Sequence, residues 1–209
     1  MIELARSWLE ENYPVSVRDN ASQVIRRFVS TCFSGAGWVN TGDIPPEVGN
    51  CIIVYAPHTS NIDWLLGVTT FIVRGIPVKI LIKSDWFFFP FGPILRGLGG
   101  VPVERSRSQN FVDYVADLLA TERDMRIIFC PEGTRKAAAT WKTGFYFAAL
   151  QARVPMVLTS LDYKKKIARI GDTIYPTGDY IADMTPAQEF YRDVHPRNPE
   201  GFNPDFLPN

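Results

Sequence analysis

The chain has 209 residues, of which 46% are hydrophobic and 21% charged, with 22 basic and 22 acidic side chains. This length suits one well-packed domain, and the balanced charge gives no global reason to expect a nucleic-acid partner. Cys32, Cys51 and Cys130 form no CxxC or Cys/His cluster, so we expect neither a disulfide framework nor a structural zinc site.

The start of the chain is charged where a signal peptide would have its apolar region, so we expect none. The most apolar uncharged runs, 64–73 and 86–95, are ten residues each. A membrane-spanning helix needs about 20 residues. We therefore expect a cytoplasmic protein with reduced thiols that does not cross a membrane.

Helical periodicity predicts two N-terminal helices, at 2–11 and 21–33, followed by a loop-rich connection. From there, short apolar strands alternate with amphipathic helices. We expect strands at 51–55, 78–82, 101–103, 126–130 and 156–161. We expect helices at 60–74, 111–122 and 144–152. The stretch 165–179 suggests a late strand pair, and the tail after Tyr191 reads as irregular.

This alternation predicts a single α/β domain with a mostly parallel central sheet flanked by helices. Within it we distinguish an N-terminal helical lead-in (1–45), a core that contains the motifs (50–162), and late strands with an irregular tail (163–209).

The stretch "APHTSNIDWLLG" contains one of the two histidines in the chain, His58, with Asp63 five residues later. It follows a predicted buried strand, at the kind of strand end where open α/β sheets place ligands. Ser60 and Asp63 also fit a helix N-cap, so the pair has a purely structural interpretation. In the functional interpretation, Asp63 accepts a hydrogen bond from the imidazole, which then takes a proton from a substrate hydroxyl. The two interpretations remain open on these residues alone.

Two further strand exits have unusual polar residues. "FCPEGTR" (129–135) places Glu132 and Arg135 beside a Pro/Gly turn, and "GGVPVERS" (99–106) ends in Arg105. Each is an ordinary loop if taken singly. Arg105 is either a solvated strand-end residue or a phosphate ligand, since a guanidinium matches a phosphate face bidentately.

Taken in order, His-x4-Asp, Gly-x4-Arg and Pro-Glu-Gly-Thr-Arg resemble the glycerophospholipid acyltransferase superfamily, whose best-known branch is the lysophosphatidic acid acyltransferases. "RVPMVLTS" (153–160) is similar to the fourth block of that family. The resemblance covers about half of the chain, from residue 52 to residue 161. The chain departs from the family pattern at Ile62 and Leu158 and in the expected lack of a long hydrophobic N-terminal helix.

The resemblance implies an O-acyltransferase that moves a fatty acyl group from acyl-CoA or acyl-carrier protein to a lysophospholipid hydroxyl, without a metal or other cofactor. It makes His58 the general base and Asp63 its orienter. The resemblance implies that the remaining site residues hold the acceptor's glycerol and phosphate. These are Arg105, Glu132, Gly133, Thr134, Arg135, Lys83 and Lys142. Lys83 and Lys142 also have a purely structural interpretation as solvated lysines.

The segment "WFFFPFGPIL" is broken by proline and glycine, so its aromatic side chains cannot all face the core. We expect some of them to reach an acyl groove or a membrane interface, with peripheral attachment to the inner face of the membrane. Three alternatives stay open: another hydroxyl acceptor, a catalytically silent lipid-binding protein on this fold, and a thioester hydrolase using Ser60 or Cys130. The sequence does not indicate the oligomeric state.

Overall fold

The computed structural model describes residues 15–103 and 111–208. Its centre is a seven-stranded sheet with the order β1-β7-β6-β2-β5-β3-β4. The strands are β1 (Val39–Thr41), β2 (Cys51–Tyr55), β3 (Lys79–Lys83), β4 (Gly100–Val103), β5 (Arg126–Phe129), β6 (Met156–Asp162) and β7 (Ile167–Ile174). All neighbouring pairs are parallel except β6 with β7. The predicted α/β fold with a mostly parallel sheet is confirmed.

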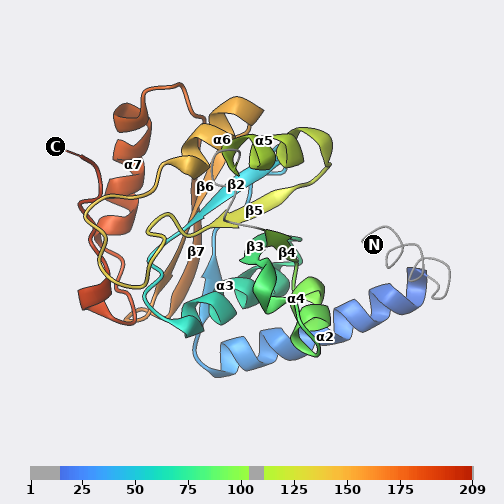
Figure 1. Cartoon of the computed structure of the whole chain (residues 1–209). Helices are drawn as coiled ribbons and strands as arrows, with labels where there is room; N and C mark the ends of the chain where they lie inside the picture. Colours follow the sequence, from blue (N-terminus) through green and yellow to red (C-terminus); the bar gives the residue numbers. More distant parts are fainter. Residues whose placement is uncertain (1–14, 104–110, 209) are drawn as a thin grey trace.

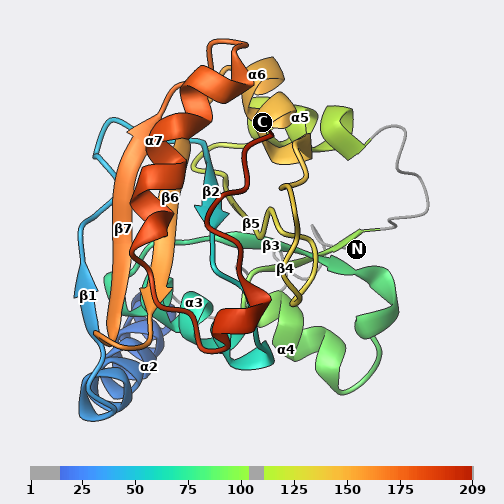
Figure 2. The same cartoon turned by 90° about the vertical axis from the view of Figure 1, so that its left-hand side faces the viewer.

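Helices cover both faces of this sheet (Figures 1 and 2). They are α2 (Val15–Gly35), α3 (Asn61–Arg74), α4 (Phe91–Gly97), α5 (Phe111–Thr121), α6 (Gly144–Ala152) and α7 (Tyr180–Arg192). Strand β2 explains the two layers, because successive side chains of a strand point to opposite faces. Ile52 and Val54 pack in the core with α5, α6 and α7, whereas Ile53 packs with Phe71 of α3.

Three parts of the fold differ from the sequence-based prediction. The loop-rich connection contains β1, whose three residues pair with β7 and are too few to show a period. The predicted late strand pair is wrong, because the segment forms one strand, β7, with β6 and β1 as its partners. Between that segment and the tail lies α7, a helix that the sequence-based prediction did not contain.

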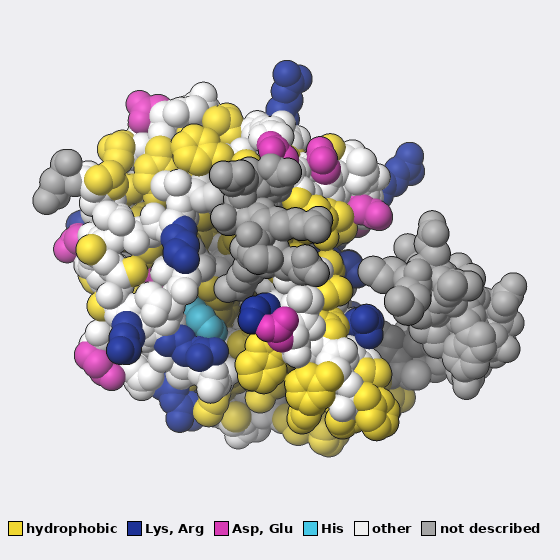
Figure 3. All heavy atoms as spheres, viewed as in Figure 1, with side chains coloured by type: hydrophobic (Ala, Val, Ile, Leu, Met, Phe, Trp, Pro, Cys, Tyr) yellow, Lys and Arg dark blue, Asp and Glu magenta, His cyan; other side chains and the backbone are white. Residues whose placement is uncertain are grey.

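The aromatic segment is also more regular than predicted. It forms a short 3₁₀ helix, η1 (Ser84–Trp86), and then α4. Pro93 fits into the first turn of α4, where a backbone N–H has no intrahelical partner to lose. Hydrophobic side chains gather on the molecular surface around α4 (Figure 3). None of the helices in the described part of the chain is both long and apolar enough to pass through a bilayer.

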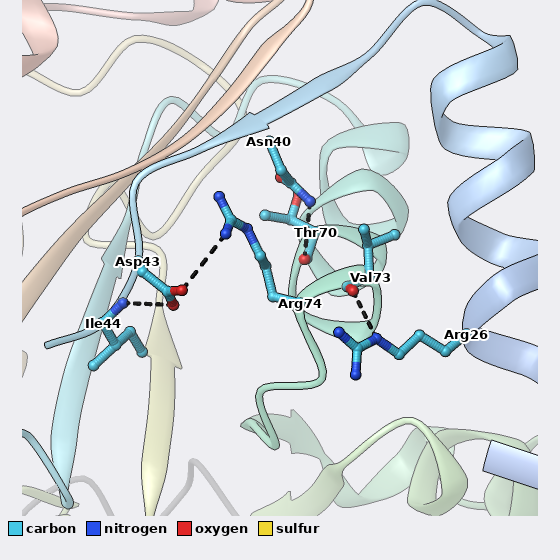
Figure 4. Close-up of polar contacts among 7 residues, drawn as sticks. All are labelled: Arg26, Asn40, Asp43, Ile44, Thr70, Val73 and Arg74. Atoms are coloured by element: carbon cyan, nitrogen blue, oxygen red, sulfur yellow. Dashed lines mark hydrogen bonds and ion pairs between the residues drawn. The ribbon is translucent and has the colours of Figure 1, made fainter. Parts of the chain in front are cut away.

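Helix α2 lies against α3 and is hydrogen-bonded to the C-terminal end of α3. The Arg26 Nε–H donates to the Val73 carbonyl at 2.8 Å (Figure 4). Helix α3 ends at Gly75 in the left-handed conformation, with φ of 69°. A Cβ at Gly75 would lie 2.5 Å from the Arg26 guanidinium, so glycine serves both the turn and this helix contact. This packing fixes α2 against the C-terminal end of α3.

Candidate active site

The motif residues that the structure describes come together because of strand direction. Strands β2, β3, β4, β5 and β6 run parallel, so their carboxyl ends share one edge of the sheet. The His58 loop follows β2, Lys83 ends β3, and the Glu132–Arg135 loop follows β5. Arg105, the predicted phosphate ligand after β4, lies outside the described residues.

Asp63 is the polar centre of this edge, with 1% of its surface exposed. Ser60 is the N-cap of α3 and forms a capping box with Asp63, as its spacing predicted. Asp63 Oδ2 accepts from the backbone N–H groups of Thr59 at 2.6 Å and Ser60 at 2.7 Å. Asp63 Oδ1 accepts from the Ser60 hydroxyl at 2.6 Å and from the Tyr163 hydroxyl at 2.5 Å. The carboxylate is therefore fully hydrogen-bonded by its own cap and by Tyr163.

The predicted hydrogen bond between Asp63 and the imidazole is not formed in this arrangement. His58 Nδ1 is buried and has no hydrogen-bond partner within the described part of the chain. A carboxylate offers about four lone-pair sites, and the Asp63 oxygens already accept from N–H and hydroxyl groups of Thr59 and Ser60 and from the Tyr163 hydroxyl. The Asp63 charge still acts on the imidazole and favours its protonated form.

The electrostatics of the imidazole favour a neutral base. Burial is the largest influence on the His58 pKa and lowers it from its ordinary value of 6.5. The negative charge of Asp63 raises the pKa, and the positive charge of Arg135 lowers it further. The net result is an imidazole that is unprotonated at neutral pH and able to accept a proton.

Glu132 joins the two motif loops. Glu132 is buried, with 4% of its surface exposed, and both carboxyl oxygens accept from the His58 backbone N–H, at 3.1 and 3.0 Å. Burial raises the pKa of the Glu132 carboxyl to about 8, opposed by the His58 bond and assisted by the negative charge of Asp63. In this structure Glu132 holds the His58 backbone, whereas the sequence resemblance implied contact with the acceptor.

The rest of the Glu132 loop faces solvent. Gly133, Thr134 and Arg135 are exposed, as is Lys142 farther along the chain. Gly133 has φ of 65°, and a Cβ there would lie 2.7 Å from Lys142 Cε, so the loop and the lysine stem are in close contact. These two cations, Arg135 and Lys142, therefore border the same loop and are open to an incoming anion.

Lys83 is less closely tied to this group. Its ammonium forms an ion pair with Asp85, and both side chains are more than half exposed. An exposed pair of this kind contributes little to stability, so it can open when a ligand offers a better anion. The structure thus leaves Lys83 at the same sheet edge with a carboxylate partner of its own.

Three residues at this edge were not predicted to belong to the site. Tyr163 follows β6 and donates to Asp63, and Asn198 in the tail binds Thr59 through both its backbone and its side-chain amide. Gly201 also lies here, since a Cβ on it would come within 2.8 Å of the Arg135 carbonyl. A polar residue directly after a strand was the available signal for Tyr163. Nothing in the sequence of the tail indicated that it returns to the motif loops.

The Ser60 hydroxyl is engaged as a helix cap, donating to Asp63 and accepting from its backbone N–H at 3.4 Å. This occupation weakens the alternative in which Ser60 acts as a nucleophile. Residues 15–103 and 111–208 contain no group of three or more histidine, cysteine or acidic side chains that could hold a metal ion.

The carboxyl ends of the parallel strands thus bring together an imidazole with a lowered pKa, a buried carboxylate and exposed cations. Residues 39–161 match the model of the family described as Acyltransferase. The chain therefore belongs to the acyltransferase family and is an acyltransferase enzyme, which confirms the resemblance drawn from the ordered motif blocks.

A solved structure has the same fold. It is the 1-acyl-sn-glycerophosphate (LPA) acyltransferase, PlsC, from Thermotoga maritima, with 20% sequence identity and a TM-score of 0.61. The similarity covers 90% of this chain and 82% of that one. A search of curated proteins gives no match.

Proposed function

We propose that this enzyme transfers a fatty acyl group from an acyl thioester, acyl-CoA or acyl-carrier protein, to the hydroxyl of a lysophospholipid, with lysophosphatidic acid as the acceptor. The observation on which this rests is the pairing of a neutral, half-buried imidazole with the Arg135 cation at one strand edge. The base suits a hydroxyl nucleophile, and the cations suit an acceptor that has a phosphate.

In the proposed reaction, His58 removes the proton from the acceptor hydroxyl as its oxygen attacks the thioester carbonyl. The tetrahedral intermediate then expels the thiolate, which takes the proton back from the imidazolium. The products are an ester and a free thiol, so protons and bonds balance. Asp63 stabilises the imidazolium through its negative charge, and Glu132 fixes the His58 backbone by accepting a hydrogen bond from its N–H.

Arg135, Lys142, Lys83 and Arg105 are the proposed phosphate ligands of the acceptor. Replacing Arg135 with alanine should raise KM for lysophosphatidic acid by about ten- to a hundredfold, the range for a lost charge-assisted hydrogen bond. Lys136, the exposed neighbouring cation, provides the matched control. Products of acyl-CoA with a panel of lysophospholipids and uncharged monoacylglycerol should be measured by mass spectrometry. The proposal fails if no lysophospholipid is acylated. The phosphate role of Arg135 fails if both variants behave alike.

We further propose that the enzyme contacts a membrane through an aromatic patch, defined as the exposed side chains of the segment after β3. These are Trp86, Phe88, Phe89, Phe91 and Ile94. Phe89 is 87% exposed, and the segment begins directly after Lys83, at the sheet edge of the site. Clustered exposed aromatic side chains suit a bilayer interface. Such a position would bring a lipid acceptor to the site.

Replacing both Trp86 and Phe89 with serine should weaken binding to phosphatidylglycerol-containing vesicles by at least about tenfold, since each buried aromatic contributes about 1.5–3 kcal/mol. Vesicle cosedimentation measures this. Thermal unfolding should be unchanged because both side chains are exposed. Tyr175, 62% exposed and located after β7 at the opposite edge, is the control for replacement by serine. Equal binding by the two variants would refute the aromatic patch as the contact surface.

A further inference from the structure

The Tyr163 hydroxyl is the least expected partner of Asp63. Tyr163 lies in the turn between β6 and β7, 100 residues from Asp63 in the sequence. Its ring packs edge-to-face against Trp38 with 5.1 Å between centroids, and its backbone N–H donates to the His195 carbonyl at 2.8 Å. The hydroxyl is thus aimed at the carboxylate by contacts on both its ring and its backbone.

Among the hydrogen-bond donors to the Asp63 carboxylate, Tyr163 is the one that does not come from the start of α3. The bonds from Thr59 and Ser60 come with the start of α3. The Tyr163 bond occupies a lone pair on Oδ1 that is left over once the cap is complete. The unpaired group nearby is His58 Nδ1, which is buried without a hydrogen-bond partner in the described part of the chain.

We propose that Tyr163 is a positioning residue of the acyltransferase site: its hydroxyl holds Asp63 and competes with the His58 imidazole for the same carboxylate. This inference rests on the proposed role of His58 as the base. When Tyr163 donates to Asp63, the carboxylate engages His58 only through its charge. When the phenol turns away, His58 Nδ1–H takes its place. Tyr163 therefore sets how strongly Asp63 supports the imidazolium.

The groups around the imidazole decide whether loss of the Tyr163 hydroxyl raises or lowers the His58 pKa. Asp63 on α3 favours the imidazolium, while burial and Arg135 disfavour it. Glu132 accepts a hydrogen bond from the backbone N–H of His58. The positive charge of Arg197, in the tail, lowers the pKa of the Tyr163 hydroxyl. Burial and the bond to Asp63 raise the pKa of Tyr163, so the phenol remains a donor. Removing the Tyr163 hydroxyl leaves a lone pair of the Asp63 carboxylate without a donor. His58 Nδ1–H can then donate to this lone pair, which stabilises the imidazolium and raises the His58 pKa.

The test is the His58 pKa in Tyr163→Phe, read from imidazole NMR resonances. The chain has two histidines, so a His195→Gln variant assigns both signals. Phenylalanine keeps the ring contact with Trp38 and removes the hydroxyl alone. The His58 pKa should rise by about half to one unit in Tyr163→Phe. The acid limb of the kcat/KM profile should move to higher pH by the same amount.

Tyr146→Phe is the matched control, because the Tyr146 hydroxyl also donates to a carboxylate, that of Asp183, at 2.7 Å. It removes an equivalent bond far from the site, so it should leave the His58 pKa unchanged. An unmoved His58 pKa in Tyr163→Phe, or an equal shift in Tyr146→Phe, overturns the inference. Full activity of a His58→Ala variant instead refutes the proposed base, and the NMR titration distinguishes the two failures.

Discussion

Replacing His58 with alanine is expected to lower kcat/KM for acyl transfer by about 10²–10⁴-fold, the contribution of a positioned general base. Burial and the Arg135 cation keep the imidazole unprotonated at neutral pH, and Glu132 fixes the His58 backbone, so the site supplies a free base in a defined position. The loss should appear mainly in kcat, because the imidazole acts on the hydroxyl proton during the reaction. Thiol release from acyl-CoA at saturating lysophosphatidic acid measures it.

His195 provides the internal control for this experiment. Its Nδ1 lies 3.1 Å from Asp162 Oδ2, so it too is a histidine beside a carboxylate. It interacts with the turn after β6, and its imidazole has no part in the proposed proton transfer. Replacement of His195 with alanine should leave kcat within about twofold of the wild type. Equal losses in the two variants would indicate that His58→Ala acts through folding, and full activity of His58→Ala would exclude it as the base.

The parts of the fold that the sequence predicted are those with several periodic residues. Strand β2 and helices α3 and α6 lie within one residue of their predicted bounds, because apolar runs and a cap mark them. Strand β1 was not predicted, since three residues show no period and its pairing with β7 depends on residues 128 positions away in the register. Long-range pairing of this kind leaves no local signal.

The site shows the same division between local and distant contacts. The cap formed by Ser60 and Asp63 follows from spacing alone, and the common edge of β2 and β5 follows from a parallel sheet. The long-range hydrogen-bond partner of the Asp63 carboxylate could not be predicted from the sequence. The carboxylate meets the Tyr163 hydroxyl, which only the tertiary fold brings near, and this contact replaces the expected bond to the imidazole.

Glu132 should make the stability of the enzyme depend on pH. Its carboxyl is buried, and burial raises its pKa to about 8 from an ordinary value of 4.5. Between these two pH values the folded protein keeps this proton and the unfolded chain has lost it. The contribution of Glu132 to stability is therefore fully present below pH 4.5 and is lost as the pH rises through 8.

The expected slope is at most about 1.4 kcal/mol of unfolding free energy for each pH unit in this window. Glu132→Gln removes the titration, and the amide oxygen can still accept from the His58 N–H. Urea unfolding at pH 5 and pH 8 should therefore give a larger loss of stability in the wild type than in Glu132→Gln, by on the order of 2–4 kcal/mol. All other groups titrate in both proteins, so the difference isolates Glu132.

Glu122→Gln is the matched control, because Glu122 is an exposed carboxylate and should leave the pH dependence of the wild type intact. Parallel stability profiles for wild type and Glu132→Gln would mean that Glu132 ionises normally in the folded protein. A normal carboxylate there would place a second full negative charge near Asp63, and the imidazolium of His58 would then be stabilised. The stability profile of Glu132 thus also tests whether His58 is a neutral base at the pH where the enzyme acts.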